Sequence, residues 1–378
     1  MAHALILGAS GISGWGILNQ IGTYPTSTFF SHITGTTTRP FSLEKAHLSA
    51  TDTRYCLVSG IDFTKRVEEV AKLLKDKVPS AETISHVFFT AYVHKDDPDE
   101  LKEVNTTLVR TAIIAIEMVS TNLKTVIMQT GGKGYGAQYP LKLNTPFSES
   151  LPRIPSPYAE SVFYYSQVDV LKELSAGKSW TFTEIRPDVV VGFVPGSNVM
   201  NFAQGLGMYL ALCKEVNGGG SSVPFPGTEN GFRAFHTDTS QDILARMEIF
   251  AAINIDNCGN GEAFNVGNET VSWSQVWPGV CQYFGLIGEG PEEGGQSIEE
   301  FVTQNVGAWE KLAGRTGIDP QVFTTYNWLF VHFMLVVFDF NRQYDLTKAK
   351  AVGFTDEVDT VEGYRIAWDR MRAAKFLP

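Results

Sequence analysis

The N-terminal segment ALILGASGISGWG constrains the fold of this 378-residue chain more than any other stretch. Its apolar run, Ala4 to Leu7, predicts a buried strand, and a helix is expected to begin near Ile12. Gly8 permits a tight turn between them, and Gly11 lets backbone amides approach a pyrophosphate. Gly14 allows the helix to pack closely on the strand. A strand, a glycine-rich turn and a helix in this order predict a site for a dinucleotide cofactor at the helix N-terminus.

The second strand is expected to end within HITGTTTRP, and this segment bears on the choice of cofactor. A site for NAD would place Asp or Glu here to hold the ribose hydroxyls. The sequence instead has threonines up to Thr38, followed by Arg39. A guanidinium beside hydroxyl groups suits a 2′-phosphate, which favours NADP(H). Further along, Asp62 and Phe63 follow the third strand, where they are expected to contact the adenine.

Strands and helices alternate through the first half of the chain. The segments LVSGIDFT, HVFFTAYV, KTVIMQTGG and WTFTEIRPDVVVGF each predict a strand, and residues 100–120 predict a helix. This alternation predicts an α/β fold of the Rossmann type, with a doubly wound parallel sheet. We expect residues 1–195 to form the NADP-binding domain. Residues 196–378 are expected to form a smaller, mainly helical substrate-binding region, with segments such as 231–270 returning to the first domain.

Composition narrows the classes of partner. The net charge is −11 and no local Lys/Arg cluster offsets it, which argues against a nucleic-acid binder. The four cysteines form no CxxC pair, so reduced thiols in a cytoplasmic protein without a metal site are expected. The N-terminus lacks the basic region of a signal peptide. The apolar run at residues 328–338 is too short to span a bilayer and predicts a buried helix.

A second glycine-rich segment, GGKGYG, follows the fifth strand and carries Lys133. The carboxyl edge of an open parallel sheet is where such folds bind ligands. About thirty residues later, SVFYYSQVDV contains Tyr164 and Tyr165 on an expected helix. Hydride transfer requires a group that stabilises negative charge on the acceptor oxygen. A tyrosine hydroxyl can do so, and a nearby ammonium would lower its pKa.

Several segments together resemble one known family. GASGISG, MQTGGKGY, VFYYSQVDVL, IRPDVVVGF, VMN and EAFNVGN are similar to the progesterone 5β-reductase/iridoid synthase-like (PRISE) family of atypical extended short-chain reductases. The resemblance extends over nearly the whole chain. It implies that Lys133 and Tyr164 are the catalytic pair, with Tyr165 turned elsewhere on the helix. It also implies an NADPH-dependent 1,4-reduction of the C=C bond of an apolar enone or enal, with hydride added to the β-carbon and Tyr164 stabilising the enolate.

The resemblance places substrate-facing side chains at Tyr92, Tyr139, Met200 and Phe330. The expected cofactor contacts are Gly8, Ser10, Gly11, Ile12, Gly14, Thr38, Arg39, Asp62, Phe63, Thr90, Ala91, Gln129, Thr130, Lys133, Tyr164, Pro187, Val189 and Val190.

Other functions on this scaffold stay open. A carbonyl or imine reductase is the main alternative, because hydride can also add to C=O or C=N. A nucleotide-sugar epimerase or dehydratase is disfavoured because no lysine stands four residues after either tyrosine. A non-catalytic NADP-binding regulator is disfavoured because Lys133 and Tyr164 are both present. The expected partner is a small apolar carbonyl compound, with no nucleic acid and no membrane, and the oligomeric state stays open to a homodimer.

Overall fold

The structure is a computed structural model and describes residues 2–196, 198 and 201–378. The chain folds as two units, each assembled from three segments. The first unit contains residues 1–188, 242–266 and 345–356, and the second contains residues 189–241, 267–344 and 357–378. Two later segments, residues 242–266 and 345–356, belong to the first unit. The sequence predicted such a segment at residues 231–270.

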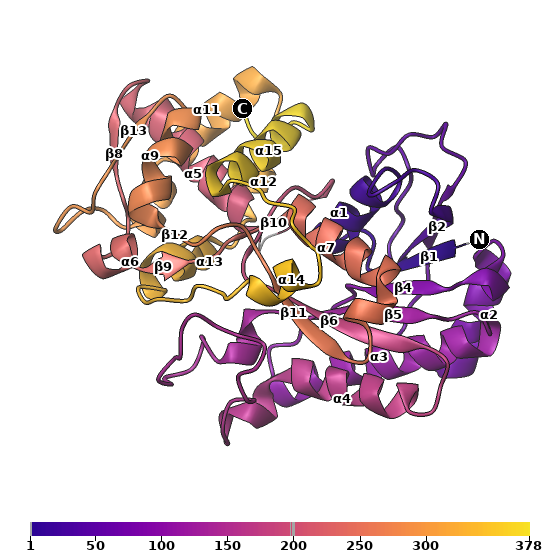
Figure 1. Cartoon of the computed structure of the whole chain (residues 1–378). Coiled ribbons are helices and arrows are strands. Elements are labelled where there is room, and N and C mark those ends of the chain that lie inside the picture. Colours follow the sequence, from indigo (N-terminus) through magenta and orange to yellow (C-terminus); the bar gives the residue numbers. More distant parts are fainter. Residues whose placement is uncertain (1, 197, 199–200) are drawn as a thin grey trace. The chain divides into compact units, whose positions relative to one another are not determined.

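A seven-stranded sheet with the order β11-β6-β5-β4-β1-β2-β3 forms the centre of the first unit (Figure 1). Every pair of neighbouring strands is parallel. The order reverses next to β1, which confirms the predicted doubly wound sheet of the Rossmann type. The strands are β1 (Ala2–Leu7), β2 (Phe30–Thr37), β3 (Tyr55–Ser59), β4 (His86–Phe89), β5 (Thr125–Gln129), β6 (Thr181–Pro187) and β11 (Glu262–Val266).

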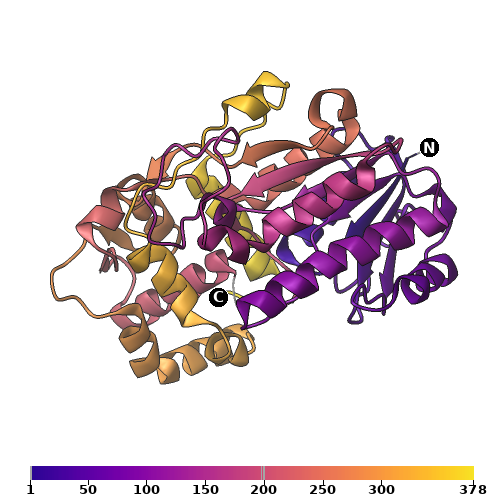
Figure 2. The same ribbon diagram turned by 90° about the horizontal axis from the view of Figure 1, so that it is seen from below.

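Helices cover both faces of this sheet. Helices α2, α3 and α4 lie side by side on one face (Figure 2). Helices α1 and α7 lie on the other face (Figure 1), where Arg246 Nε donates to Gln20 Oε1 at 3.3 Å. The helices are α1 (Ile12–Ile21), α2 (Val67–Lys77), α3 (Pro98–Val119), α4 (Phe163–Ser175), α7 (Gln241–Ile253), α8 (Ile255–Cys258) and α14 (Thr347–Ala351), with short 3-10 turns η1 (Ala81–Thr83), η2 (Gly132–Tyr135) and η3 (Tyr158–Ser161).

The sequence pattern explains these elements. Residues 4–7 of β1 are fully buried, because a central parallel strand covered on both faces needs a continuous apolar run. Helix α3 begins at Pro98, and Asp97 caps it by accepting hydrogen bonds from the amides of Asp99 and Glu100. Its buried face packs into the core under the sheet. Both ends of α3 agree with the helix expected over 100–120.

The second unit is mainly helical, as predicted, and its core is rich in aromatic rings such as Trp273 and Trp277. Its small sheets are pairs of short strands. The helices are α5 (Phe202–Asn217), α6 (Glu229–Arg233), α9 (Trp273–Tyr283), α10 (Ile298–Gln304), α11 (Val306–Thr316), α12 (Gln321–Thr324), α13 (Trp328–His332) and α15 (Thr360–Ala373), with a π-helical turn η4 (Phe333–Val337). The strands are β7 (Val190–Val191), β8 (Ser222–Pro224), β9 (Phe235–His236), β10 (Thr239–Ser240), β12 (Val271–Ser272) and β13 (Ile287–Glu289).

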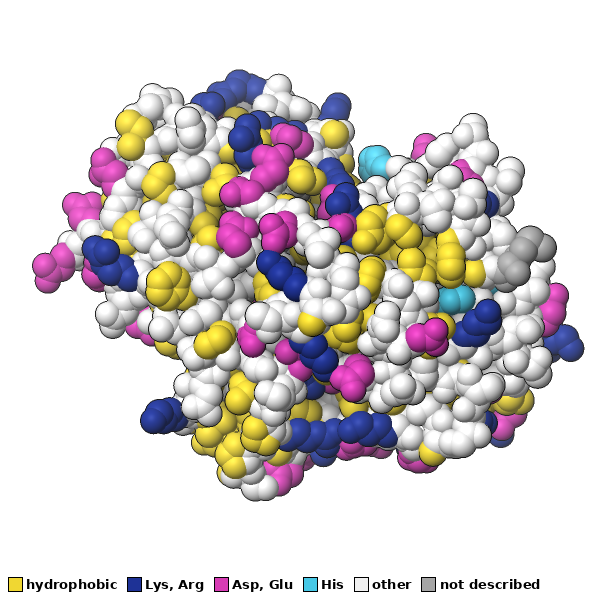
Figure 3. Space-filling view, in the orientation of Figure 1, with side chains coloured by type: hydrophobic (Ala, Val, Ile, Leu, Met, Phe, Trp, Pro, Cys, Tyr) yellow, Lys and Arg dark blue, Asp and Glu magenta, His cyan; other side chains and the backbone are white. Residues whose placement is uncertain are grey.

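One apolar stretch is less buried than its sequence predicts. Residues 328–338 form α13 and the turn η4, yet Leu329 is 64% exposed and Val337 is 47% exposed. The predicted helix is present but only partly buried, because Val331, Met334 and Leu335 are enclosed while these two side chains are exposed. Within the described residues, no helix combines the length and apolar character needed to cross a membrane. On the face drawn in Figure 3, basic, acidic and apolar side chains are interspersed.

Candidate active site

The turn after β1 is shaped to receive a diphosphate. Gly8 has φ +86°, and a Cβ there would lie 2.9 Å from backbone atoms of Thr90 and Ala91. A Cβ on Gly14 would lie only 2.4 Å from the carbonyl oxygen of Gly8. Both positions therefore exclude any side chain. Helix α1 starts after Gly11, which supplies no side-chain cap, so the N-terminal amides of the helix suit an anion.

Other predicted cofactor residues surround this turn. Ser10 is exposed and Ile12 is partly exposed at the start of α1. Thr90 follows β4, and its amide and hydroxyl both donate to the carbonyl oxygen of Leu7, at 3.0 and 2.8 Å. These bonds hold the end of β4 against the end of β1. Thr90 and Ala91 thus lie next to the glycine turn, and their contact with a cofactor stays a prediction.

Thr38 and Arg39 are both exposed just beyond the end of β2. The Thr37 hydroxyl donates to the carbonyl oxygen of Arg39 at 2.7 Å and fixes the local backbone. Within the described residues the Arg39 guanidinium has no hydrogen bond or ion pair. It is therefore available to an anionic ligand at the carboxyl edge of the sheet.

Asp62 and Phe63 differ in what they can offer a cofactor. The carboxylate of Asp62 accepts from the amide of Thr64 at 3.0 Å and from its hydroxyl at 2.7 Å, which closes a local turn. The Phe63 ring is only 5% exposed and packs in the core of the first unit. Little of the ring face remains for stacking, so Asp62 is the better placed of the two for contact with the adenine.

The end of β5 is tied to β6. The amide of Thr130 donates to the carbonyl oxygen of Ile185 at 2.9 Å, and its hydroxyl donates to Glu184 at 2.8 Å. Gln129 precedes it, with a buried side-chain oxygen that has no hydrogen-bond partner among the described residues. Pro187 ends β6, and its carbonyl oxygen would lie 3.3 Å from a Cβ on Gly131.

Lys133 and Tyr164 are carried by different elements beyond the carboxyl ends of the strands. Lys133 lies in η2, and Tyr164 lies in the first turn of α4. The Tyr164 hydroxyl oxygen would be 3.5 Å from a Cβ on Gly131, two residues before the lysine. No hydrogen bond to this hydroxyl is formed by the described residues. Although Lys133 is an exposed residue, partial burial of its ammonium lowers its pKa.

The protonation state of Tyr164 differs from the expectation. Burial raises the pKa of its hydroxyl well above the ordinary value, and the nearby Tyr92 and Glu184 raise it further. The predicted lowering by a neighbouring ammonium is therefore wrong, because desolvation disfavours the phenolate. Tyr164 keeps its proton at neutral pH and acts as a hydrogen-bond donor.

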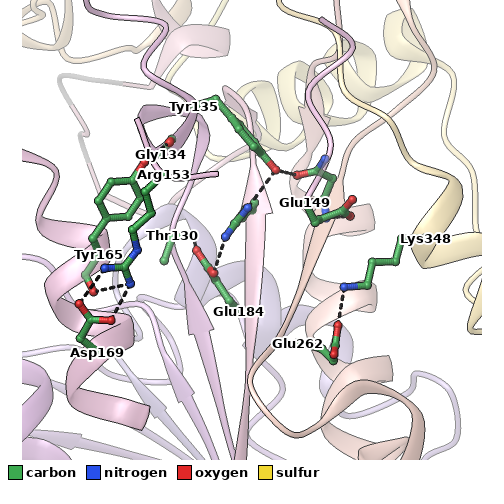
Figure 4. A network of polar contacts seen from close by, with 12 residues as sticks. Thr130, Gly134, Tyr135, Glu149, Arg153, Tyr165, Asp169, Glu184, Glu262 and Lys348 are labelled. Atoms are coloured by element: carbon green, nitrogen blue, oxygen red, sulfur yellow. Dashed lines mark hydrogen bonds and ion pairs between the residues drawn. The ribbon is translucent and has the colours of Figure 1, made fainter. Parts of the chain in front are cut away.

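Tyr165 has a different environment, shown in Figure 4. Its hydroxyl donates to the carbonyl oxygen of Gly134 at 2.5 Å and accepts from the amide of Ile154 at 3.0 Å. Arg153 lies 4.7 Å above its ring and forms a bidentate ion pair with Asp169 at 2.8 and 2.6 Å. Neighbouring helical residues point about 100° apart, which separates the two tyrosines. Tyr165 is therefore a packed, doubly hydrogen-bonded residue.

The sequence did not predict a polar network that includes Tyr135 and Glu184 (Figure 4). Arg186 donates to Glu184 at 2.8 Å and to the Tyr135 hydroxyl at 3.2 Å. Tyr135 in turn donates to Asn265 Oδ1 at 2.6 Å. Tyr135, Arg186 and Asn265 lie within segments that carried the family resemblance, but no spacing rule connects residues so far apart in sequence.

The predicted substrate residues of the first unit lie beyond β4 and η2. Tyr92 is 50% exposed, with its ring centre 5.9 Å from that of Phe163. Tyr139 stacks on Tyr158 at 4.7 Å. Both tyrosines keep part of their surface accessible.

The remaining predicted residues belong to the second unit. Phe330 is partly exposed in α13, with its ring 6.4 Å from that of Phe202. Val190 lies in β7, and Val189 precedes it, accepting a hydrogen bond from the amide of Thr239 at 3.0 Å. Met200 lies outside the described residues. These assignments stay predictions.

The chain is similar to known proteins over most of its length. Residues 4–378 match the family model described as a PRISE-like Rossmann-fold domain. The chain belongs to this PRISE-like family. It is 36% identical to the short chain dehydrogenase sirQ of Leptosphaeria maculans, over 100% of this chain and 98% of that protein. It is 28% identical to a 3-oxo-Delta(4,5)-steroid 5-beta-reductase of Arabidopsis thaliana, over 84% of this chain and 81% of that protein.

The fold of this PRISE-like chain is also found among solved structures. The GDP-mannoheptose C4 reductase MlghC from Campylobacter jejuni, solved with NADP bound, is 14% identical, with a TM-score of 0.60. The alignment covers 97% of each chain, and at this identity it shows the fold alone. The family and its named relatives make this PRISE-like protein an oxidoreductase of the short-chain dehydrogenase/reductase superfamily, with a Rossmann fold for a nicotinamide dinucleotide. This confirms the predicted family, fold and enzyme class.

Proposed function

We propose that this PRISE-like protein is an NADPH-dependent ene-reductase that reduces the C=C bond of an apolar enone or enal. The observation that carries the proposal is the Tyr164 hydroxyl. It is free of protein hydrogen bonds among the described residues, its pKa is raised, and it lies beside the loop of Lys133. A neutral phenol is a donor for a carbonyl oxygen that becomes an enolate.

The raised pKa of Tyr164 also indicates in which direction the reaction is favoured. A tyrosine that removes a proton from an alcohol must first be ionised, and desolvation of Tyr164 opposes that. A tyrosine that donates to a developing oxyanion needs its proton. The site therefore favours reduction over the alcohol oxidation with which a nucleotide-sugar epimerase begins.

The other residues have distinct roles in the proposal. NADPH, when bound, supplies the hydride that is added to the β-carbon. The amides at the start of α1, behind Gly8, Gly11 and Gly14, bind its diphosphate. Arg39 binds the 2′-phosphate as a free guanidinium. Lys133 keeps positive charge near the reacting oxygen.

Carbonyl reduction is the second candidate, and one test separates the two. The purified protein is given NADPH with an enone, and separately with the saturated ketone of the same skeleton. We expect NADPH consumption with a saturated carbonyl product from the enone, and little reaction with the ketone. An alcohol product from both substrates would instead establish a carbonyl reductase.

Substitution of the tyrosine links this reaction to the site. Tyr164→Phe should slow enone reduction by roughly tenfold to a hundredfold, because one donor to a developing oxyanion is lost. Tyr283→Phe is the control, since its hydroxyl lies in the second unit and donates to the exposed carboxylate of Asp369 at 2.6 Å. Equal rates for Tyr164→Phe and the unaltered protein would remove Tyr164 from the reaction.

A further inference from the structure

The loop that carries Lys133 has little rigidity of its own. Glycines occupy positions 131, 132, 134 and 136, and Gly136 has φ +80°. Glycine has more conformational freedom to lose than any other residue, so a glycine-rich loop is costly to order. The single turn η2 is closed by two backbone hydrogen bonds, Gly134 N to the Gly131 carbonyl oxygen at 3.0 Å and Gly136 N to the Lys133 carbonyl oxygen at 3.2 Å. Contacts from outside the loop must therefore fix the lysine.

Tyr135 holds one side of this loop. Its side chain is 7% exposed and stacks on Phe147 with ring centres 4.8 Å apart and planes within 5°. Its hydroxyl donates to Asn265 at 2.6 Å and accepts from Arg186 at 3.2 Å. Asn265 is itself fixed, because its side-chain amide donates to the carbonyl oxygen of Phe147 at 2.9 Å. Figure 4 labels Tyr135 within this network and draws its hydrogen bonds as dashed lines.

Tyr165 holds the other side. Its hydroxyl donates to Gly134, the residue between Lys133 and Tyr135. Because Tyr165 directly follows Tyr164 on α4, this bond links the helix of one predicted catalytic residue to the loop of the other. The position of Tyr165 is fixed in turn by the Arg153–Asp169 pair, which packs on its ring.

We propose that the hydroxyls of Tyr135 and Tyr165 are positioning groups that fix Lys133 relative to Tyr164. The inference rests on the proposed function, in which Lys133 takes part in the reaction. Neither tyrosine needs to touch substrate or cofactor. Their effect passes through the backbone of residues 133–135, and a shift of about 1 Å there is enough to misplace the ammonium.

A double-mutant cycle tests this directly. Tyr135→Phe keeps the ring stacked on Phe147 and removes only the hydroxyl. In the presence of Lys133 it should lower kcat for enone reduction on the order of tenfold. In a Lys133→Ala background it should change kcat less than about twofold, because no ammonium remains to be positioned. Tyr165→Phe is tested in the same two backgrounds, and the same changes in kcat are expected. It provides a second test if Tyr135→Phe does not fold.

Tyr55→Phe is the matched control. The Tyr55 hydroxyl is part-buried in the same unit and donates to the carbonyl oxygen of Leu18 at 2.9 Å. Its loss should lower the melting temperature and leave kcat unchanged in both backgrounds. If Tyr135 and Tyr165 have a purely structural role, their substitution should lower kcat by the same factor with and without Lys133. That result would overturn the positioning role but leave the proposed function standing. Full activity of Lys133→Ala would overturn the role of Lys133 in the proposed function as well.

Discussion

Arg186 and Glu184 form an ion pair at 2.8 Å with only 19% and 9% of their side chains exposed. Burial alone would lower the pKa of Arg186, but the hydrogen bond and charge of Glu184 raise it. The two side chains alternate with Ile185 on β6, so both point to the same face of the sheet. The positive charge of Arg186 is thus neutralised by Glu184. Lys133 is the basic residue within the glycine-rich loop of residues 131–136.

Removal of Glu184 should destabilise the protein strongly. Glu184→Ala leaves the Arg186 guanidinium buried without its carboxylate and deprives the Thr130 hydroxyl of its acceptor. Loss of one partner of a buried pair costs about 3–5 kcal/mol. Urea unfolding of both proteins measures the change. Glu173→Ala breaks an exposed pair with Arg110 and should leave the midpoint nearly unchanged. Similar midpoints for both variants would contradict the prediction.

The alkaline decline in activity should belong to Lys133. Its pKa is lowered by burial, so its ammonium loses charge as the pH rises through a value below the usual one. The pKa of Tyr164 is raised, so its hydroxyl stays protonated over the same range. Lys133→Arg should move the decline to higher pH, because a guanidinium titrates above about pH 12. The pH profile of kcat/KM for each variant is the measurement. If Tyr164→Phe abolishes the decline, the tyrosine is the titrating group.

Cofactor choice should depend on Arg39. A charge-assisted hydrogen bond contributes about 1.5–3 kcal/mol, so Arg39→Ala should weaken NADPH binding by roughly ten- to a hundredfold and leave NADH binding nearly unchanged. Dissociation constants for both cofactors can be measured by fluorescence quenching. Arg110→Ala is the control, since Arg110 is an exposed arginine of α3 that is already paired with Glu173. Equal affinity for NADPH and NADH before substitution would exclude a 2′-phosphate site.

The glycine turn should not tolerate a methyl group. Gly14→Ala would place a Cβ 2.4 Å from the Gly8 carbonyl oxygen, so α1 must move away from β1. We expect loss of NADPH binding together with a lower melting temperature. Gly314→Ala lies in α11 with no atom within 4 Å of the added Cβ, and it should stabilise the protein by about 0.5–1 kcal/mol. Normal NADPH affinity in Gly14→Ala would show that the turn does not hold the diphosphate.

Local patterns predicted the fold well. The glycine turn and the alternating strands and helices depend on neighbouring residues, and both are found where the sequence placed them. The side-chain hydrogen bonds of Thr130, Tyr135 and Asn265 could not be predicted, because they join segments more than fifty residues apart. Burial was equally hard to anticipate: the raised pKa of Tyr164 and the enclosed ring of Phe63 depend on packing that no spacing describes.

The threading of the chain through both units also bears on its synthesis. Strand β11, which pairs with β6, is made only when translation reaches residues 262–266, and residues 345–356 follow later still. Until then, β6 is a bare sheet edge on a nascent chain, and such edges invite pairing with other polypeptides. Truncation before residue 266 would therefore release an aggregation-prone fragment. Because each unit is built from three segments, a single cut cannot separate the two units for independent expression.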